Sequence, residues 1–247
     1  MAKSGIDIEV KRFYLSLVFP GLLILTIWLV YVVTGILETN PYHWGILPRT
    51  WLGLKGILFS PLIHGDLKHL TANTFPLLVL TTALIYFYRN LGYRVFFLTW
   101  IVTGVLVWAG ARSSYHIGAS GILYGLAGFL AVSGFIRRHV GLIAISFLVI
   151  FQYGSMIYGI FPVEERISWE SHLLGLGQGF FWAWVFRREG PPRPAPVLPD
   201  EADEADSDLP WDEFELEGKQ KKPKPQPPPP VTPPEWVSDW TNNSNIT

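Results

Sequence analysis

One stretch decides how this chain folds: Gly118-Ala119-Ser120-Gly121-Ile122-Leu123-Tyr124-Gly125-Leu126-Ala127-Gly128. It places a Gly-x-Ser-Gly motif at the start of an apolar segment, and its glycines recur at helical spacing. Small residues at this spacing let the backbones of two membrane helices approach closely. The motif alone is a weak indication of chemistry, because a packing face needs the same glycines. However, a hydroxyl at membrane depth costs free energy unless it is satisfied, so such a residue often marks function.

The composition is that of a membrane protein. Of the 247 residues, 49% are hydrophobic and only 16% are charged, whereas soluble domains carry about 25% charged residues. The net charge of -1 gives no basic excess that would indicate a nucleic-acid partner. The absence of cysteine excludes disulfides, thiolate metal sites and cysteine nucleophiles.

Six stretches are apolar and long enough to cross a hydrocarbon core of roughly 30 Å, which takes about 20 residues of helix. They cover residues 13–34, 69–88, 93–111, 118–135, 140–160 and 171–186. The loop at 35–68 is rich in Trp, Leu and Pro, and we expect it to form a short subdomain in the membrane interface. The predicted fold class is an all-α membrane protein with a bundle of six transmembrane helices.

The distribution of Lys and Arg predicts the orientation of the bundle. Nine of these residues flank the spans on one side and five on the other, which favours both termini in the cytoplasm. We therefore expect a cytoplasmic N-terminus at 1–12, a six-span core at 13–187 and a cytoplasmic tail at 188–247, in a multi-pass protein of the plasma (cell inner) membrane. In this topology the second, fourth and sixth spans all start at the outer face.

The tail has a different composition from the core. It holds fourteen of the twenty prolines, ten acidic residues between positions 200 and 217, and four lysines between positions 219 and 224. Such a stretch cannot bury enough apolar area to offset the entropy of ordering, so we expect disorder. Its proline run at 227–230 is predicted to be polyproline II. A solvated spacer is favoured over a site for a partner, whose identity the sequence does not indicate.

A histidine begins the last span. In Ser171-His172-Leu173-Leu174-Gly175-Leu176-Gly177-Gln178-Gly179, Gly175 and Gly179 follow His172 at i+3 and i+7 and share its helix face. Close approach of this face to the glycines of the fourth span brings His172 within hydrogen-bond reach of Ser120. A serine and a histidine in this relation are the minimum apparatus for acyl transfer. The alternative is a histidine satisfied by a neighbouring hydroxyl or carbonyl.

A third polar group begins the second span. His69 and Asn73 are four residues apart and share a helix face, and both side chains can donate hydrogen bonds to a developing oxyanion. Zinc binding by His64 and His69 is disfavoured, because their spacing of five does not match one helix face and no cysteine or His-Glu-x-x-His motif supports it. We expect no metal and no cofactor.

Together these three segments resemble the rhomboid intramembrane serine proteases, over roughly residues 10 to 188. The resemblance implies a six-helix bundle with a water-filled cavity and a Ser–His dyad that lacks an acid. Ser120 would be the nucleophile and His172 the general base and then acid. His69, Asn73 and the Ser120 N–H would form the oxyanion hole, and Tyr124 would pack on the His172 ring. The supporting glycines are Gly118, Gly121, Gly175 and Gly179.

The expected function is therefore cleavage of a single-span membrane protein within the lipid bilayer, near the outer end of its span. Many members of the family carry a Trp-Arg pair in the first loop, where this chain has Leu54-Lys55-Gly56. Two alternatives stay open: a non-catalytic relative that binds transmembrane helices, and a small transporter. A transporter is expected to place polar groups at the midplane and on both sides of it, whereas here they cluster near the outer face.

Overall fold

The computed structural model describes residues 2–162 and 168–191. Within these residues it contains helices and their connections, with a single isolated antiparallel bridge between Ile46 and His116. The predicted tail lies, from residue 192 onward, outside the described residues.

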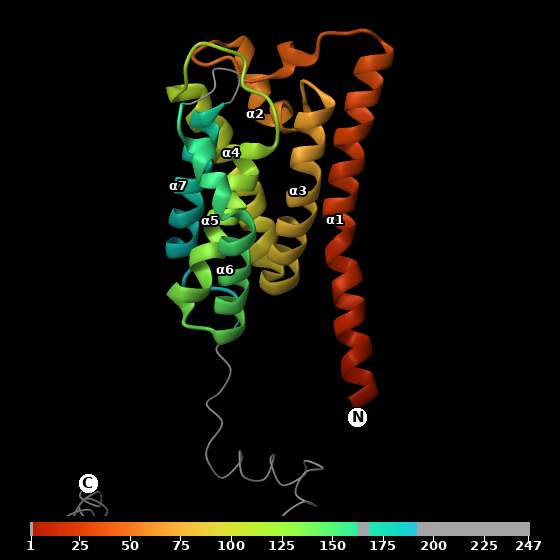
Figure 1. Ribbon diagram of the computed structural model, residues 1–247, viewed down its shortest axis with the longest axis vertical. Helices are drawn as coiled ribbons and strands as arrows, with labels where there is room; N and C mark the ends of the chain where they lie inside the picture. Colours follow the sequence, from red (N-terminus) through yellow and green to blue (C-terminus); the bar gives the residue numbers. More distant parts are fainter. Residues whose placement is uncertain (1, 163–167, 192–247) are drawn as a thin grey trace, which may run out of the picture. The chain divides into compact units, whose positions relative to one another are not determined.

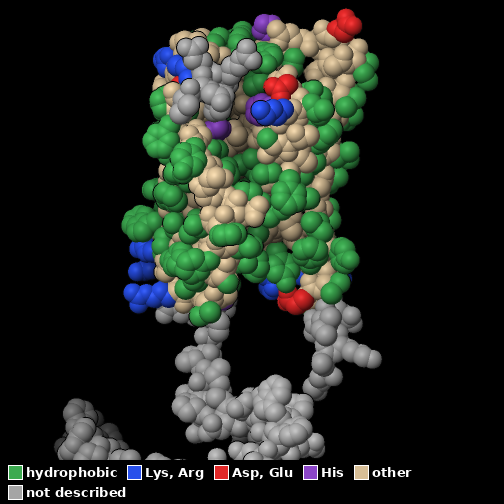
Figure 2. All heavy atoms as spheres, in the orientation of Figure 1, with side chains coloured by type: hydrophobic (Ala, Val, Ile, Leu, Met, Phe, Trp, Pro, Cys, Tyr) green, Lys and Arg blue, Asp and Glu red, His purple; other side chains and the backbone are tan. Residues whose placement is uncertain are grey.

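Within the described ranges the chain forms six long helices, which run alongside one another (Figure 1). They are α1 (Ala2–Ile36), α3 (Leu67–Tyr88), α4 (Asn90–Gly110), α5 (Ser120–Arg137), α6 (Val140–Tyr153) and α7 (Trp169–Val185). Among the described residues, five segments are long and apolar enough to cross a membrane, namely α1 from Ile8, α3, α4, α5, and α6 with its continuation to Ile160. Helix α7 has 17 residues, at the short end of the range of about 17–25 that spans a bilayer. Figure 2 shows an apolar band between two ends that carry the charged side chains. The predicted all-α membrane fold is confirmed.

Two helices differ in extent from the predicted spans. Helix α1 begins at Ala2 rather than at residue 13, because the preceding segment holds no proline and its Glu9 pairs with Arg12 across one helical turn at 3.4 Å. The fifth span is α-helical only to Tyr153 and continues as the 3-10 helix η4 (Gly154–Ile160). Gly154 is a poor helix former, which favours this change of helix type.

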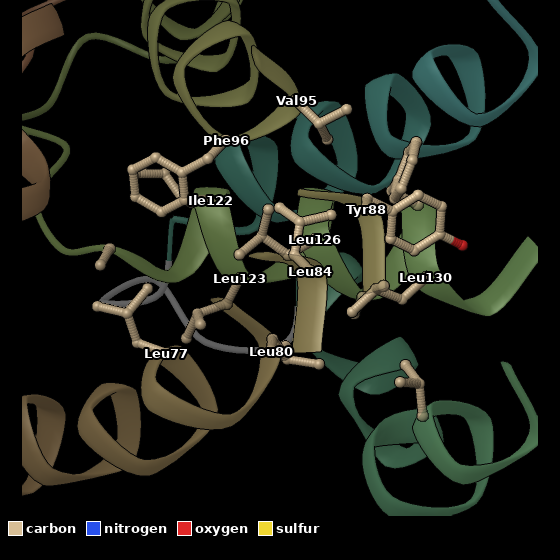
Figure 3. Packing of buried hydrophobic residues seen from close by; sticks show 14 of the residues in the cluster. Leu77, Leu80, Leu84, Tyr88, Val95, Phe96, Ile122, Leu123, Leu126 and Leu130 are labelled. Atoms are coloured by element: carbon tan, nitrogen blue, oxygen red, sulfur yellow. The ribbon is translucent and has the colours of Figure 1, made fainter. Parts of the chain in front are cut away.

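Helix α5 lies at the centre of the bundle. It packs against α3, α4, α6 and α7, and nearly all of its side chains as far as Leu130 are buried. Figure 3 shows side chains from three helices meeting there, among them Leu84 of α3, Phe96 of α4 and Leu126 of α5. Lipid tails are as apolar as these side chains, so within a membrane the cluster stabilises the bundle by van der Waals packing and not by removal from water.

The first loop folds into short helices and joins the loop that precedes α5. Its elements are η1 (Pro41–Trp44), η2 (Leu52–Lys55), α2 (Gly56–Phe59) and η3 (Ser60–Leu62). Ile46 and His116 exchange two backbone hydrogen bonds of 2.9 Å, and the Gly118 N–H donates to the Ser60 carbonyl at 2.9 Å. These bonds hold the chain just before Ser120.

Helices α5 and α7 touch backbone to backbone. A Cβ atom added at Gly175 would lie 2.1 Å from the Gly121 carbonyl oxygen, and one added at Gly179 would lie 2.2 Å from the Gly125 carbonyl oxygen. No side chain fits at either position. The glycine spacing of the two segments therefore produces the close approach that the sequence predicted.

This contact gives a matched pair of substitutions in one helix. We expect Gly175→Ala to destabilise the protein by about 1–3 kcal/mol, the usual range for overpacking. Gly177→Ala should be neutral or slightly stabilising, because a Cβ there meets nothing within 4 Å. Unfolding in detergent, followed by circular dichroism against temperature, measures both. Equal stability of the two variants would contradict the backbone contact.

Candidate active site

Ser120 and His172 meet at one end of the bundle. Ser120 is the first residue of α5 and His172 the fourth residue of α7, and both helices start at the end where the first loop lies (Figure 1). The Ser120 Oγ and the His172 Nε2 lie 2.7 Å apart. The histidine is 8% exposed, so its hydrogen bond is shielded from competing water.

Tyr124, one turn after Ser120, holds the imidazole from one face. Its ring stacks on the His172 ring with centroids 4.2 Å apart and planes inclined by 7°. The Tyr124 hydroxyl donates to the Met156 carbonyl in η4 at 2.6 Å. The tyrosine is therefore fixed at both ends, and this restricts the orientation of the histidine ring.

The second nitrogen of His172 contacts the backbone. Its Nδ1 lies 2.8 Å from the Gly159 carbonyl oxygen. A carbonyl only accepts hydrogen bonds, so Nδ1 carries the proton and Nε2 keeps a lone pair that faces the Ser120 hydroxyl. Sequence reasoning missed Gly159, because a backbone acceptor in a 3-10 helix has no side-chain signature.

His69 lies against the backbone that leads into Ser120. A Cβ added at Gly118 would lie 2.6 Å from the His69 Nε2, and Gly118 has a φ of +98°. The position thus needs glycine both for conformation and for space. Asp66 caps α3 by accepting from the His69 N–H at 2.7 Å, which fixes the start of that helix. The N–H groups in the first turn of α5 have no intrahelical acceptor, so the Ser120 N–H is available beside His69.

Asn73 lies one turn further along α3 and is 5% exposed. Its Nδ2 donates to the His69 carbonyl at 2.8 Å, and its Oδ1 has no hydrogen-bond partner among the described residues. Within that part of the chain, Asn73 makes no hydrogen bond to Ser120 or His172. One N–H of its amide remains for a further acceptor.

His64 lies beside His69, outside the helix. The two rings have centroids 4.9 Å apart at 60°, and no group of three or more His, Asp or Glu side chains suited to a metal occurs in the described residues. Burial, and to a smaller extent the nearby His69, together lower the pKa of His64 to about 4, against the opposing effects of the Leu62 backbone and Asp66. His64 is therefore neutral at pH 7.

A polar network that sequence reasoning missed connects the loop before α5 to the start of α7. The His116 Nδ1 lies 2.5 Å from the Ser168 Oγ, and its Nε2 lies 3.0 Å from the Arg112 carbonyl. Glu170 is buried, and its Oε1 lies 3.7 Å from the Arg112 Nε. Glu170 therefore contacts Arg112 in the loop before α5. Among the described residues it makes no hydrogen bond to the ring of His172. These contacts fix how the first turns of α5 and α7 face each other.

The low pKa of His64 predicts a dependence of stability on pH. Below pH 6.5 the unfolded chain protonates this histidine and the folded chain does not, so stability falls as the pH decreases from about 6.5 to about 4. The loss reaches roughly 3 kcal/mol, at about 1.4 kcal/mol per pKa unit. In thermal unfolding at several pH values, His64→Gln should show a shallower dependence, and the exposed His43→Gln should keep that of the wild type. Equal dependence in all three proteins would show that His64 titrates normally.

Comparison with known proteins agrees with this architecture. Residues 49–189 match the Rhomboid domain. The chain is 36% identical over 171 residues to "Uncharacterized protein Rv1337" of Mycobacterium tuberculosis, which covers 62% of this chain and 67% of that relative. It is 37% identical over 142 residues to "Uncharacterized protein ML1171" of Mycobacterium leprae, which covers 53% of this chain and 56% of that relative.

The Rhomboid match extends from the first loop to just beyond α7, and it includes the helices that carry Ser120 and His172. The chain belongs to the rhomboid family, as an integral membrane protein of helical architecture.

Proposed function

We propose that this protein is an intramembrane serine endopeptidase in which Ser120 is the nucleophile and His172 the general base. The observation that carries the proposal is the 2.7 Å hydrogen bond between the Ser120 Oγ and the His172 Nε2. Serine is a weak nucleophile until an adjacent base takes its proton. In this arrangement Nε2 accepts that proton while Oγ bonds to the scissile carbonyl carbon.

The Gly159 carbonyl takes the place of the acid in a triad. An acid orients the imidazole, selects its tautomer and stabilises the imidazolium that forms. Here the carbonyl selects the tautomer at 2.8 Å, and stacking on Tyr124 orients the ring. His172 then gives its proton to the leaving amine as the peptide C–N bond breaks, and water hydrolyses the acyl-enzyme with the same base. The reaction needs no cofactor.

The developing oxyanion would lie between α3 and the start of α5. The Ser120 N–H, His69 and the remaining Asn73 N–H are the donors for it. The position of the His69 ring supports this assignment, because the ring packs on the backbone of Gly118, two residues before the Ser120 N–H.

The expected substrate is a single-span membrane protein, cut near the membrane face at which α3, α5 and α7 begin. The depth of the site supports this, since both reacting residues lie in the first turn or so of their helices. A peptide bond inside a helix is inaccessible, so a substrate segment has to unwind there, and helix-breaking residues lower the cost. We place both termini in the cytoplasm and the site toward the outside of the cell membrane.

A fluorophosphonate probe tests the dyad without knowledge of the substrate. The wild type, purified in detergent, should be labelled, because an activated serine attacks the phosphorus of the probe, fluoride leaves, and the serine becomes phosphonylated. Ser120→Ala should abolish labelling, and His172→Ala should slow it by about 10²–10⁴, the usual contribution of a general base. Gel fluorescence against time measures the rates.

The matched control is Ser155→Ala, which removes an exposed hydroxyl in η4 and should label like the wild type. A folded wild type that stays unlabelled would refute the protease and favour a relative that only binds transmembrane helices. Labelling that survives Ser120→Ala would mean that a different serine is the nucleophile.

The oxyanion donors predict a second set of effects. His69→Ala and Asn73→Ala should each lower turnover of a transmembrane substrate by about 10²–10³, the effect of removing one donor. Thr71→Ala is the control, because Thr71 is exposed on the same helix and its hydroxyl bonds only to α3 carbonyls. If Thr71→Ala lowered turnover as much as the other two, the effects would report disruption of α3 instead of lost donors.

A further inference from the structure

A cavity lies at the opposite end of the helices from Ser120. It has a volume of about 570 Å³ and lies between α1, the end of α3 and the start of α4. Three cations line it, namely Lys11, Arg12 and Arg89. The apolar side chains of Ile8 and Ile85 complete its walls.

Arg12 is held in place with one donor unused. Its Nη2 donates to the Tyr86 carbonyl, and its guanidinium lies 4.7 Å from the centroid of the Tyr86 ring. Glu9 is 3.4 Å away and neutralises part of its charge. The Arg12 Nε is nevertheless buried without a hydrogen-bond acceptor among the described residues, which is costly unless an acceptor binds there.

The other two cations are exposed, and neither Lys11 nor Arg89 has an ion-pair partner among the side chains that the structure describes. Arg89 forms the junction between α3 and α4 at a φ of +51° and a ψ of -124°, a conformation that glycine adopts more easily. With Glu9 counted, three cations and one carboxylate leave the cavity with a net charge of +2.

We infer that this cavity binds the phosphate of an anionic phospholipid. Basic pockets between transmembrane helices are suited to such headgroups, and the apolar walls suit the first carbons of the acyl chains. The position agrees with this occupant, because Arg89 in the cavity wall lies at the junction where the apolar helix α3 ends and the apolar helix α4 begins. Binding here is independent of Ser120 and of the proposed protease activity.

Native mass spectrometry of the full chain tests the site, with phosphatidylglycerol or phosphatidylcholine added to the detergent. The wild type should bind phosphatidylglycerol more tightly. In Lys11→Gln/Arg89→Gln that affinity should fall by about fivefold for each cation removed. The control is Arg187→Gln/Arg188→Gln, which removes two cations beyond the end of α7, outside this cavity, and should bind as the wild type does.

Two further measurements distinguish the alternatives. Ile8→Trp narrows the cavity without changing its charge and should also weaken binding; an unchanged affinity would overturn the site. Inorganic phosphate should not displace the lipid, and displacement would show a site for free phosphate. Equal affinity for the two lipids, or an equal loss in the control, would reduce the effect to surface charge and overturn the inference.

Discussion

The backbone contact between α5 and α7 is the constraint on which the rest of the site depends. Packed helices are usually 8–10 Å apart, a distance set by side chains. Here the carbonyl oxygens of Gly121 and Gly125 occupy the space that side chains at Gly175 and Gly179 would need. Because the two helices approach this closely near their starts, a short hydroxyl on one reaches an imidazole on the other.

The fold and the central pair could be predicted because both depend on local periodicity. The apolar stretches predicted the helices. Gly175 and Gly179, at i+3 and i+7 from His172, predicted that this histidine lies on the helix face that meets the fourth span. The extent of the helices was less predictable. Helix α1 continues through a polar segment that holds no proline and contains the Glu9–Arg12 ion pair, and the fifth span changes to a 3-10 helix at a glycine.

The groups around the pair could not be read from the sequence, because they come from loops that only the tertiary structure brings together. His116 is an example. It pairs with Ile46 through its backbone and with Ser168 through its ring, and neither partner is near it in sequence. The one-turn spacing of His69 and Asn73 correctly placed them on one helix, yet it did not reveal that the Asn73 amide donates to the His69 carbonyl.

The hydrogen bond from His172 to Gly159 has a consequence for how such a protein is dissected by mutation. The acceptor is a carbonyl, so no substitution at Gly159 removes it from the chain. A Cβ at that position would instead lie 2.1 Å from the Tyr124 hydroxyl oxygen and 3.2 Å from the His172 Nδ1, and would disturb both contacts. Its placement depends instead on the path of η4, which the Tyr124 hydroxyl also holds through Met156. The orientation of the histidine ring thus depends on the backbone path of η4, which changes in loop length, a proline, or a side chain at Gly159 would alter.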